Sequence, residues 1–205
     1  MTSSLRDELG AAKEPDFEFD LPAGWAKTPV STAAEKSVQS QLAKRLMAAG
    51  RPEILAQLRP MVNRAYSKMQ DARAIATIGP MERTDDMVMV PGSIVASIRR
   101  STAEMTVDQM AVGMIRKFNA QPLFGDPRIM RFRTEREEDM QGEKIIIDTV
   151  TYLTPVPGSK RQKALQLTAS FMRPVDVPAD DEPAVRIRAL FDAIVSSLRW
   201  IEPKS

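Results

Sequence analysis

The chain has 205 residues, of which 43% are hydrophobic and 27% charged, and 29 basic against 27 acidic residues give a formal net charge of +2. A chain of this length and composition buries a sizeable core, so disorder throughout the chain is excluded. The even charge balance also gives no reason to expect nucleic acid as a partner.

The sequence contains neither histidine nor cysteine. These residues supply the usual general base, soft metal ligand and thiol nucleophile of enzymes. Their absence removes most catalytic schemes and every disulfide. We therefore expect a protein that is not an enzyme and that has no catalytic residue, no cofactor and no metal.

Residues 1–15 are rich in charged side chains and contain no apolar stretch of the kind a signal peptide needs. They predict a flexible leader, followed by one domain over residues 16–205. No apolar run reaches the ~18 residues of a membrane-spanning helix. A cytoplasmic location is the simplest expectation from these absences.

The first elements of the domain follow from periodicity and capping. Residues 17–21 alternate apolar and charged, which predicts a strand, and residues 22–25 then turn the chain. Thr32 and Glu35 match a capping box, and apolar residues three or four apart predict a helical pair over residues 32–71. Because proline interrupts helical hydrogen bonding, we expect a kink or a break at Pro60.

The rest of the chain reads as strands, one internal helix and one closing helix. Short links between consecutive strands imply antiparallel pairing, and helices must cover the apolar sheet face. The sequence therefore predicts an α+β domain with an antiparallel sheet of about six to seven strands, flanked by helices, with the helical pair inserted after the first strand. The expected segments are strands at 72–78, 86–90 and 93–101, a helix capped by Thr106, a loop at 121–127, strands at 129–137, 143–154 and 163–172, and a helix ending near Leu198.

Both chain ends resemble PsbP-like proteins, the fold group that includes the extrinsic photosystem P protein, the Ran-binding Mog proteins and bacterial relatives. The similarity lies in the opening strand that runs into Leu-Pro-Ala-Gly-Trp at residues 21–25 and in the closing helix at residues 191–200. It implies a PsbP-like sandwich in which Phe19, Trp25, Phe191 and Trp200 are structural. It also implies a binding or assembly accessory without a shared active site.

A group of basic residues in and around the predicted strands at 129–137 and 163–172 is the clearest candidate partner surface. Arg131 and Arg133 alternate on one predicted strand, and if neighbouring strands add their basic residues, a positive strip forms that could bind an acidic protein, a phosphate ligand or single-stranded nucleic acid. Nucleic acid is disfavoured because it usually stacks on exposed aromatic side chains. Phe132 is expected to point to the other face. The alternative is an exposed sheet face with cross-strand ion pairs. The full candidate surface comprises Arg128, Arg131, Arg133, Lys160, Arg161 and Lys163.

Carboxylate clusters offer weaker candidates for chemistry. Neither residues 85–86 nor residues 180–182 have the alternating spacing of a calcium loop, so solvated loop charges are the simpler interpretation. A glycosidase would need a pair of carboxylates, and the acidic residues at 135–139 do not single out a pair. Ser159 and Lys160 could form a Ser-Lys nucleophile, but they lie on a predicted turn where the lysine would stay protonated.

The thirteen methionines are a softer signal. Methionine-rich surfaces adapt to varied partners, although most of these positions fit buried faces. If the helical pair were loosely docked, its Met/Tyr/Leu face would form a partner-binding groove.

Two functions of different classes therefore remain open. The first is a non-catalytic protein-binding or assembly accessory module, of which an inhibitor or immunity-type protein is a special case. The alternative is a carboxylate-based hydrolase or small-molecule-binding protein with a pocket between sheet and helix.

Overall fold

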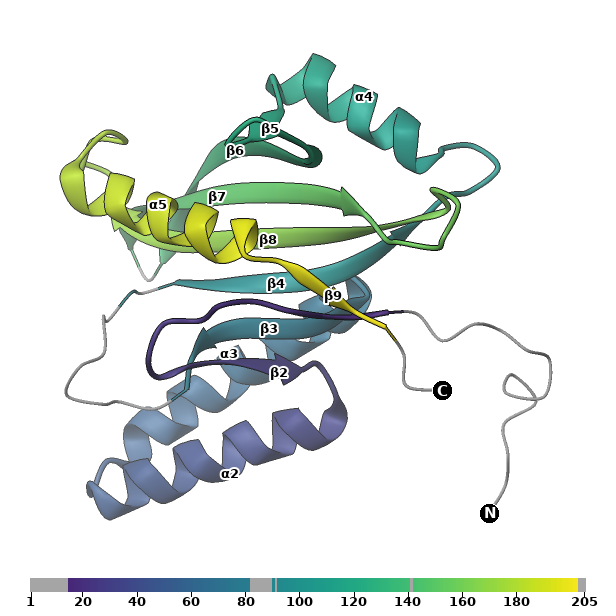
Figure 1. Ribbon diagram of the computed structural model, residues 1–205. Coiled ribbons are helices and arrows are strands. Elements are labelled where there is room, and N and C mark those ends of the chain that lie inside the picture. Colours follow the sequence, from purple (N-terminus) through teal and green to yellow (C-terminus); the bar gives the residue numbers. More distant parts are fainter. Residues whose placement is uncertain (1–14, 82–89, 91, 141, 203–205) are drawn as a thin grey trace, which may run out of the picture.

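The computed structural model describes residues 15–81, 90, 92–140 and 142–202, and its centre is a twisted antiparallel sheet with helices on both faces (Figure 1). The elements in chain order are β1 (Asp16–Glu18), β2 (Trp25–Pro29), α2 (Thr32–Ala48), α3 (Pro52–Asp71), β3 (Ala74–Pro80), β4 (Gly92–Arg100), α4 (Val107–Phe118), β5 (Gln121–Leu123), β6 (Asp126–Met140), β7 (Glu143–Pro155), β8 (Lys163–Pro174), α5 (Glu182–Ser196) and β9 (Arg199–Ile201).

The large sheet has seven strands in the order β2-β3-β4-β8-β7-β6-β5, all antiparallel, and β1 pairs with β9 in a separate two-stranded sheet. This confirms the expected α+β class and strand number. The helical pair follows β2, the first strand of the large sheet.

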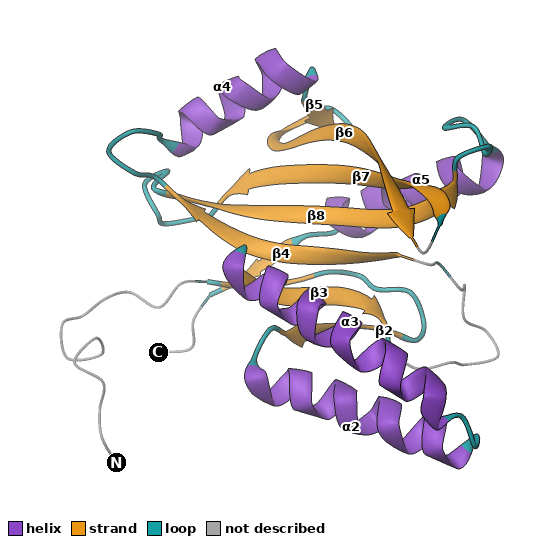
Figure 2. Ribbon diagram, turned by 180° about the vertical axis from the view of Figure 1, so that it is seen from behind, coloured by secondary structure: helices purple, strands orange, loops and turns teal. Residues whose placement is uncertain are grey.

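The two faces of the sheet carry different helices. Helix α5 and the β1–β9 pair cover one face, here called the α5 face, whereas α3 and α4 lie on the opposite face, here called the α3 face (Figures 1 and 2). Alternation along β8 explains the division, because successive side chains of a strand point to opposite sides. Leu165 and Leu167 of β8 are fully buried, whereas Gln166 and Thr168 between them are half-buried.

The main core fills the α5 face. Phe191 of α5 is 0% exposed and packs against Phe171 of β8 with ring centroids 6.3 Å apart. The paired chain ends close the same face, where Phe17 lies opposite Trp200 in the β1–β9 register. Trp25 is also buried there, as the resemblance at the chain ends implied.

Helix α4 begins where the sequence predicts. Thr106 Oγ1 accepts from the amide of Gln109 at 3.2 Å, and the Gln109 side chain accepts from the amide of Thr106 at 2.8 Å, which completes a capping box. Val107 then packs against Leu153 and Ala164 in a second, smaller core on the α3 face.

The helical pair is only lightly buried. None of the residues of α2, all of which the structure describes, is buried, and α3 buries Tyr66 alone. Helix α2 is capped by Ser31 rather than by Thr32, since the Ser31 hydroxyl accepts from the amide of Ala34 at 3.1 Å. Helix α3 continues through Pro60 as a single element, so the expected break is absent from this described helix.

Three short strands were not expected from the sequence. β5 lies in the segment 121–127, which the sequence pattern assigns to a loop. β2 begins at the last residue of the predicted turn, and β9 directly follows the expected end of the closing helix. Strands of three to five residues are too short to show a clear alternation in the sequence. Whether such a segment forms a strand depends on the strand with which it pairs. All but the last residue of the leader expected at 1–15, and most of the strand expected at 86–90, lie outside the described residues.

Candidate functional site

The two central arginines of the candidate surface lie on the α5 face and contact carboxylates of the same chain. Arg131 Nε donates to Asp192 of α5 at 2.7 Å, and Arg133 donates to Asp148 of β7 at 2.6 Å. Their side chains are 27% and 28% exposed. Phe132 points to the opposite face, as expected, and stacks on Phe118 of α4 with centroids 4.6 Å apart.

The other four candidate residues lie apart from this pair. Arg128 is exposed near the start of β6 and binds Asp126 at 2.7 Å. Lys160 and Arg161 lie in the turn between β7 and β8, where both have positive φ, and Lys163 begins β8. Strand β7 separates β6 from β8, so the six residues are not on adjacent strands.

A cluster of charged residues surrounds the buried Asp148, whose side chain is 0% exposed. Asp148 accepts from Arg133 of β6 and, at 2.8 Å, from Arg188 of α5. Glu135 of β6 accepts from Arg133 and, at 2.8 Å, from Arg173 of β8. We call these five residues the Asp148 cluster. Because it joins β6, β7, β8 and α5, it helps fix α5 on the sheet.

A second polar contact holds α5 one turn further along, at Asp192. The Tyr152 hydroxyl donates to Asp192 Oδ1 at 2.6 Å, and the same oxygen accepts from Arg131. Burial, and then the hydrogen bond to Asp192, raise the pKa of Tyr152 far above its ordinary value. Tyr152 is therefore a neutral hydrogen-bond donor throughout the physiological pH range.

A cavity of about 630 Å³ opens beside this cluster, between the first half of α5 and the end of β8; we call it the α5 pocket. Its lining is mostly apolar and includes Arg173. Arg173 is 8% exposed, and its Nε is buried without a hydrogen-bond acceptor among the described residues. Asp181 and Arg186 stand at the same cavity, and Arg186 pairs with the exposed Glu182.

A groove of about 680 Å³ runs between α3 and the α3 face of the sheet; we call it the α3 groove. None of the described residues that line it is charged. Met69, Met81 and Met172 contribute flexible apolar surface, and the latter two are 42% and 49% exposed. Hydroxyl-bearing residues of β2, β3, β4 and β8 also line it, namely Thr28, Thr77, Ser93 and Ser170.

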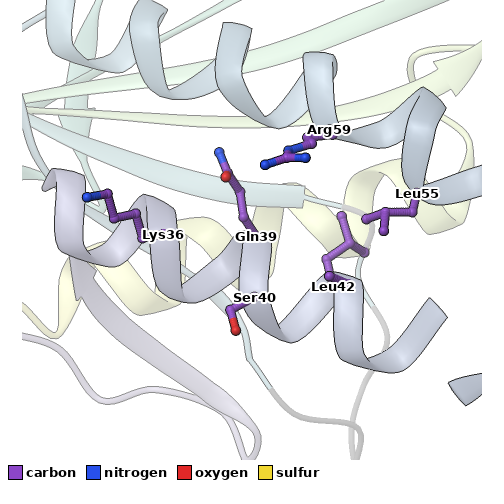
Figure 3. Close-up of a pocket in the computed structure, with 7 residues that line it drawn as sticks. Lys36, Gln39, Ser40, Leu42, Leu55 and Arg59 are labelled. Carbon is purple, nitrogen blue, oxygen red and sulfur yellow. The ribbon is translucent and has the colours of Figure 1, made fainter. Parts of the chain in front are cut away.

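A third, smaller cavity of about 280 Å³ separates α2 from α3. Figure 3 shows Leu42 of α2 and Leu55 of α3 close together, with Arg59 of α3 above Gln39 of α2. Gln39 donates to Asn63 of α3 at 2.6 Å. Its lining mixes apolar residues with long, flexible polar side chains, which is typical of a gap between two packed helices. Of the three cavities, it offers the least support for a binding site.

The remaining sequence candidates do not form a catalytic constellation in the described part of the chain. Ser159 Oγ donates to the carbonyl of Val156 at 2.7 Å, and Lys160 is exposed. Glu137 pairs with Lys144 at 2.8 Å. No group of three acidic residues among those described could hold a metal ion. Residues 85–86 lie outside the described part of the chain.

The Asp148 cluster was missed in the sequence, although two signals marked it. Asp148 follows three isoleucines in β7, so a carboxylate enters a buried strand. Arg188 falls in the buried stripe of α5, four residues after Ala184 and three before Phe191. Charges in apolar stripes require partners, and the partner of Asp148 on α5 is 40 residues away.

No known protein-family model matches the chain, and no curated protein sequence matches it either. Among the described residues, no helix combines the length and the apolar character needed to cross a membrane.

Two solved structures are similar to this chain in outline. LpqN, a protein involved in cell envelope biogenesis of Mycobacterium tuberculosis, is 13% identical with a TM-score of 0.45, and the match covers 93% of this chain and 86% of LpqN. A protein from Bacteroides thetaiotaomicron VPI-5482 is 8% identical with a TM-score of 0.41, over 90% of this chain. This chain spans 44% of the Bacteroides protein. Neither likeness assigns a family or a function to the chain.

Proposed function

We propose that this protein is a non-catalytic binding module that holds an apolar, uncharged segment of a partner protein in the α3 groove. The observation that carries the proposal is the combination of a large groove with a lining that has no charged residue among those described. A charged or acidic partner segment would gain no ion pair there and would lose its hydration.

The light attachment of the helical pair supports the same function. Tyr66 is the one buried residue of α3, and Met69 on the next turn is half-buried at the groove. Methionine side chains are flexible and polarizable, so a groove lined by several of them adapts to the shape of a partner. Hydroxyl groups on the floor can hydrogen-bond with the backbone of a bound segment.

The arginines give less support to an acidic partner. Arg131 and Arg133 already contact carboxylates of the same chain, so an acidic protein would have to compete with Asp192 and Asp148 for them. The resemblance of the chain ends to PsbP-like proteins supports an accessory role but does not favour either surface.

A selection from a displayed library of random twelve-residue peptides, with the full-length protein as target, tests the proposal. We expect the enriched peptides to be apolar and uncharged. Ser93→Arg, which introduces a charge at an exposed position of the groove floor, should weaken their binding by at least about tenfold. Isothermal titration of synthetic peptides measures this change.

Ser196→Arg is the matched control, because Ser196 is an exposed serine at the end of α5, on the opposite face of the sheet. It should leave peptide affinity unchanged. Enrichment of acidic peptides, equal binding by the two variants, or no enrichment at all would contradict the assignment of the α3 groove.

A further inference from the structure

Strand β6 has a neighbouring strand on its outer side along only its first part. It has 15 residues, but its pairing with β5 extends no further than the contact of Gln121 with Arg131 (Figure 2). On the inner side, β7 pairs with β6 as far as Met140. Residues 132–139 therefore form a free edge of the described sheet, which we call the β6 edge.

The backbone of the β6 edge has hydrogen-bonding groups without a partner strand. In an antiparallel pair, every second residue of a strand directs its N–H and C=O groups away from its neighbour. No turn or loop in the described part of the chain hydrogen-bonds to the backbone of residues 132–139. Such an edge is a template on which another strand can pair, and the side chains that flank it determine which strand is accepted.

The far half of the β6 edge is acidic. Residues 136–144, which include the turn into β7, contain four carboxylates and two basic groups, so their net charge is −2. Glu137 and Asp139 lie on the same face of β6, because side chains alternate along a strand. A second copy of this chain would double the negative charge along this edge, whereas a segment with basic side chains would be attracted to it.

The basic residues nearby neutralise this end only weakly. Lys144 pairs with Glu137 at 2.8 Å and Arg136 pairs with Glu138 at 2.5 Å, but the two basic side chains are 67% and 68% exposed. Exposed ion pairs contribute little to stability, so the basic groups of a partner can replace them. Arg133 differs in this respect, because its acceptor Asp148 is fully buried.

The near end of the β6 edge lies beside exposed apolar side chains. Phe118 of α4 stacks on Phe132, where the edge begins, and is still 38% exposed. Ile115, three residues earlier and therefore on the same side of the helix, is 45% exposed. The β6 edge is therefore apolar at one end and acidic at the other.

We propose that the β6 edge accepts an extended segment of a partner protein as an additional antiparallel strand. An antiparallel strand begins beside Asp139 and ends beside Phe132, so its first residues are basic and its last residue is apolar. Main-chain hydrogen bonds supply the affinity in this mode of binding, and side chains supply the specificity. No described residue of β6 lines the α3 groove, so this surface is tested separately from the proposed function.

Isothermal titration of the full-length protein with the peptide acetyl-KTKTVTVL-amide tests the proposal. The acidic peptide acetyl-ETETVTVL-amide is the matched probe for charge. We expect one-to-one binding of the basic peptide, at least about tenfold tighter than that of the acidic one. In NMR spectra, backbone amides of residues 134–138 should exchange more slowly with solvent when the basic peptide is bound.

Methylated peptides test strand pairing itself. Two versions of the basic peptide carry N-methyl groups on alternate residues, one on the odd and the other on the even positions. Only one set of amides faces β6, so one version should lose at least about tenfold in affinity and the other should stay within about threefold of the parent peptide. Both versions keep the charge of the parent peptide.

A charge-reversal variant locates the site. Glu137→Lys should weaken binding of the basic peptide at least about fivefold. Glu53→Lys is the matched control, because Glu53 is an exposed carboxylate of α3 that also pairs with a basic residue. It should leave the affinity unchanged within about twofold. Thermal unfolding reports whether each variant is folded.

Several results would overturn the proposal. One is the absence of binding by the basic peptide, and another is equal affinity for the basic and acidic peptides. Equal affinities of the two methylated peptides would show that no strand pairs with β6. Equal losses of affinity in the Glu137→Lys and Glu53→Lys variants would place the peptide away from the β6 edge.

Discussion

The two faces of the central sheet differ in how firmly their helices are attached. On the α5 face, Phe191 is fully buried and Arg188 and Asp192 of the same helix contact residues of the sheet. On the α3 face, the helical pair buries only Tyr66. The comparison teaches that the same strands can carry a tightly packed helix on one face and a lightly attached helical pair on the other, with a groove left open beside that pair.

The largest expected effect comes from removing the apolar anchor of each face. Phe191→Ala should lower the free energy of unfolding by about 4 kcal/mol, because a large cavity forms in a close-packed core. Tyr66→Ala should cost at most about 2 kcal/mol, since the site is less enclosed and can relax. Urea denaturation followed by circular dichroism measures both.

Limited proteolysis sharpens this comparison. Tyr66→Ala should increase cleavage within residues 32–71 while the rest of the chain stays resistant, because the helical pair detaches locally from the sheet. Equal losses of stability for the two substitutions, or cleavage spread over the whole Tyr66→Ala chain, would show that the helical pair is as firmly attached as α5.

The next largest effect concerns charge. Asp148→Asn should destabilise the protein by about 3 kcal/mol, because it leaves the buried Arg188 and the half-buried Arg133 with less compensating charge. Asp126→Asn is the matched control on the same sheet, since Asp126 pairs with the exposed Arg128. It should leave the denaturation midpoint unchanged. Similar midpoints for the two variants would mean that the Asp148 cluster adds nothing to the attachment of α5.

The smallest effect is the pH dependence contributed by Tyr152. Burial and the contact with Asp192 raise the pKa of Tyr152 in the folded state, whereas in the unfolded chain it titrates near about 10. Its contribution to stability is therefore complete below about pH 10 and is lost as the pH rises above that value, because only the unfolded chain releases the proton. Unfolding of the wild-type protein should become easier from about pH 10 upward.

Tyr152→Phe isolates this contribution. At neutral pH the variant should lose about 1 kcal/mol with the hydrogen bond to Asp192, and its stability should fall less steeply at alkaline pH. Tyr66→Phe is the comparison variant. Burial also raises the pKa of Tyr66, on the other face of the sheet, but the shift is smaller than that of Tyr152, so the alkaline slope should change less. If both variants keep the same alkaline slope as the wild type, tyrosine ionisation is not its cause.

Much of the fold follows from local patterns in the sequence. The capping box at Thr106, the alternation of Leu165 with Gln166 and the stripe that ends at Phe191 each lie within a few residues, where periodicity and capping act. The order of helices and long strands could therefore be predicted, together with the α+β class. The sequence did not decide whether the helical pair packs into the core or is loosely docked, because its methionines and Tyr66 suited either a buried face or a groove.

The candidate sites depended on tertiary contacts instead. The alternation of Arg131 and Arg133 placed them on one face, but only the docking of α5, more than fifty residues later, supplied Asp192 as a partner. Arg173 and Glu135 are 38 residues apart, so their contact leaves no local pattern. The sequence by itself determined which segments become helices and long strands, because those choices rest on neighbouring residues, whereas the short strands β2, β5 and β9 depended on their pairing partners. Only the tertiary structure decided which charges are buried and which cavities stay open, because those depend on how distant segments pack.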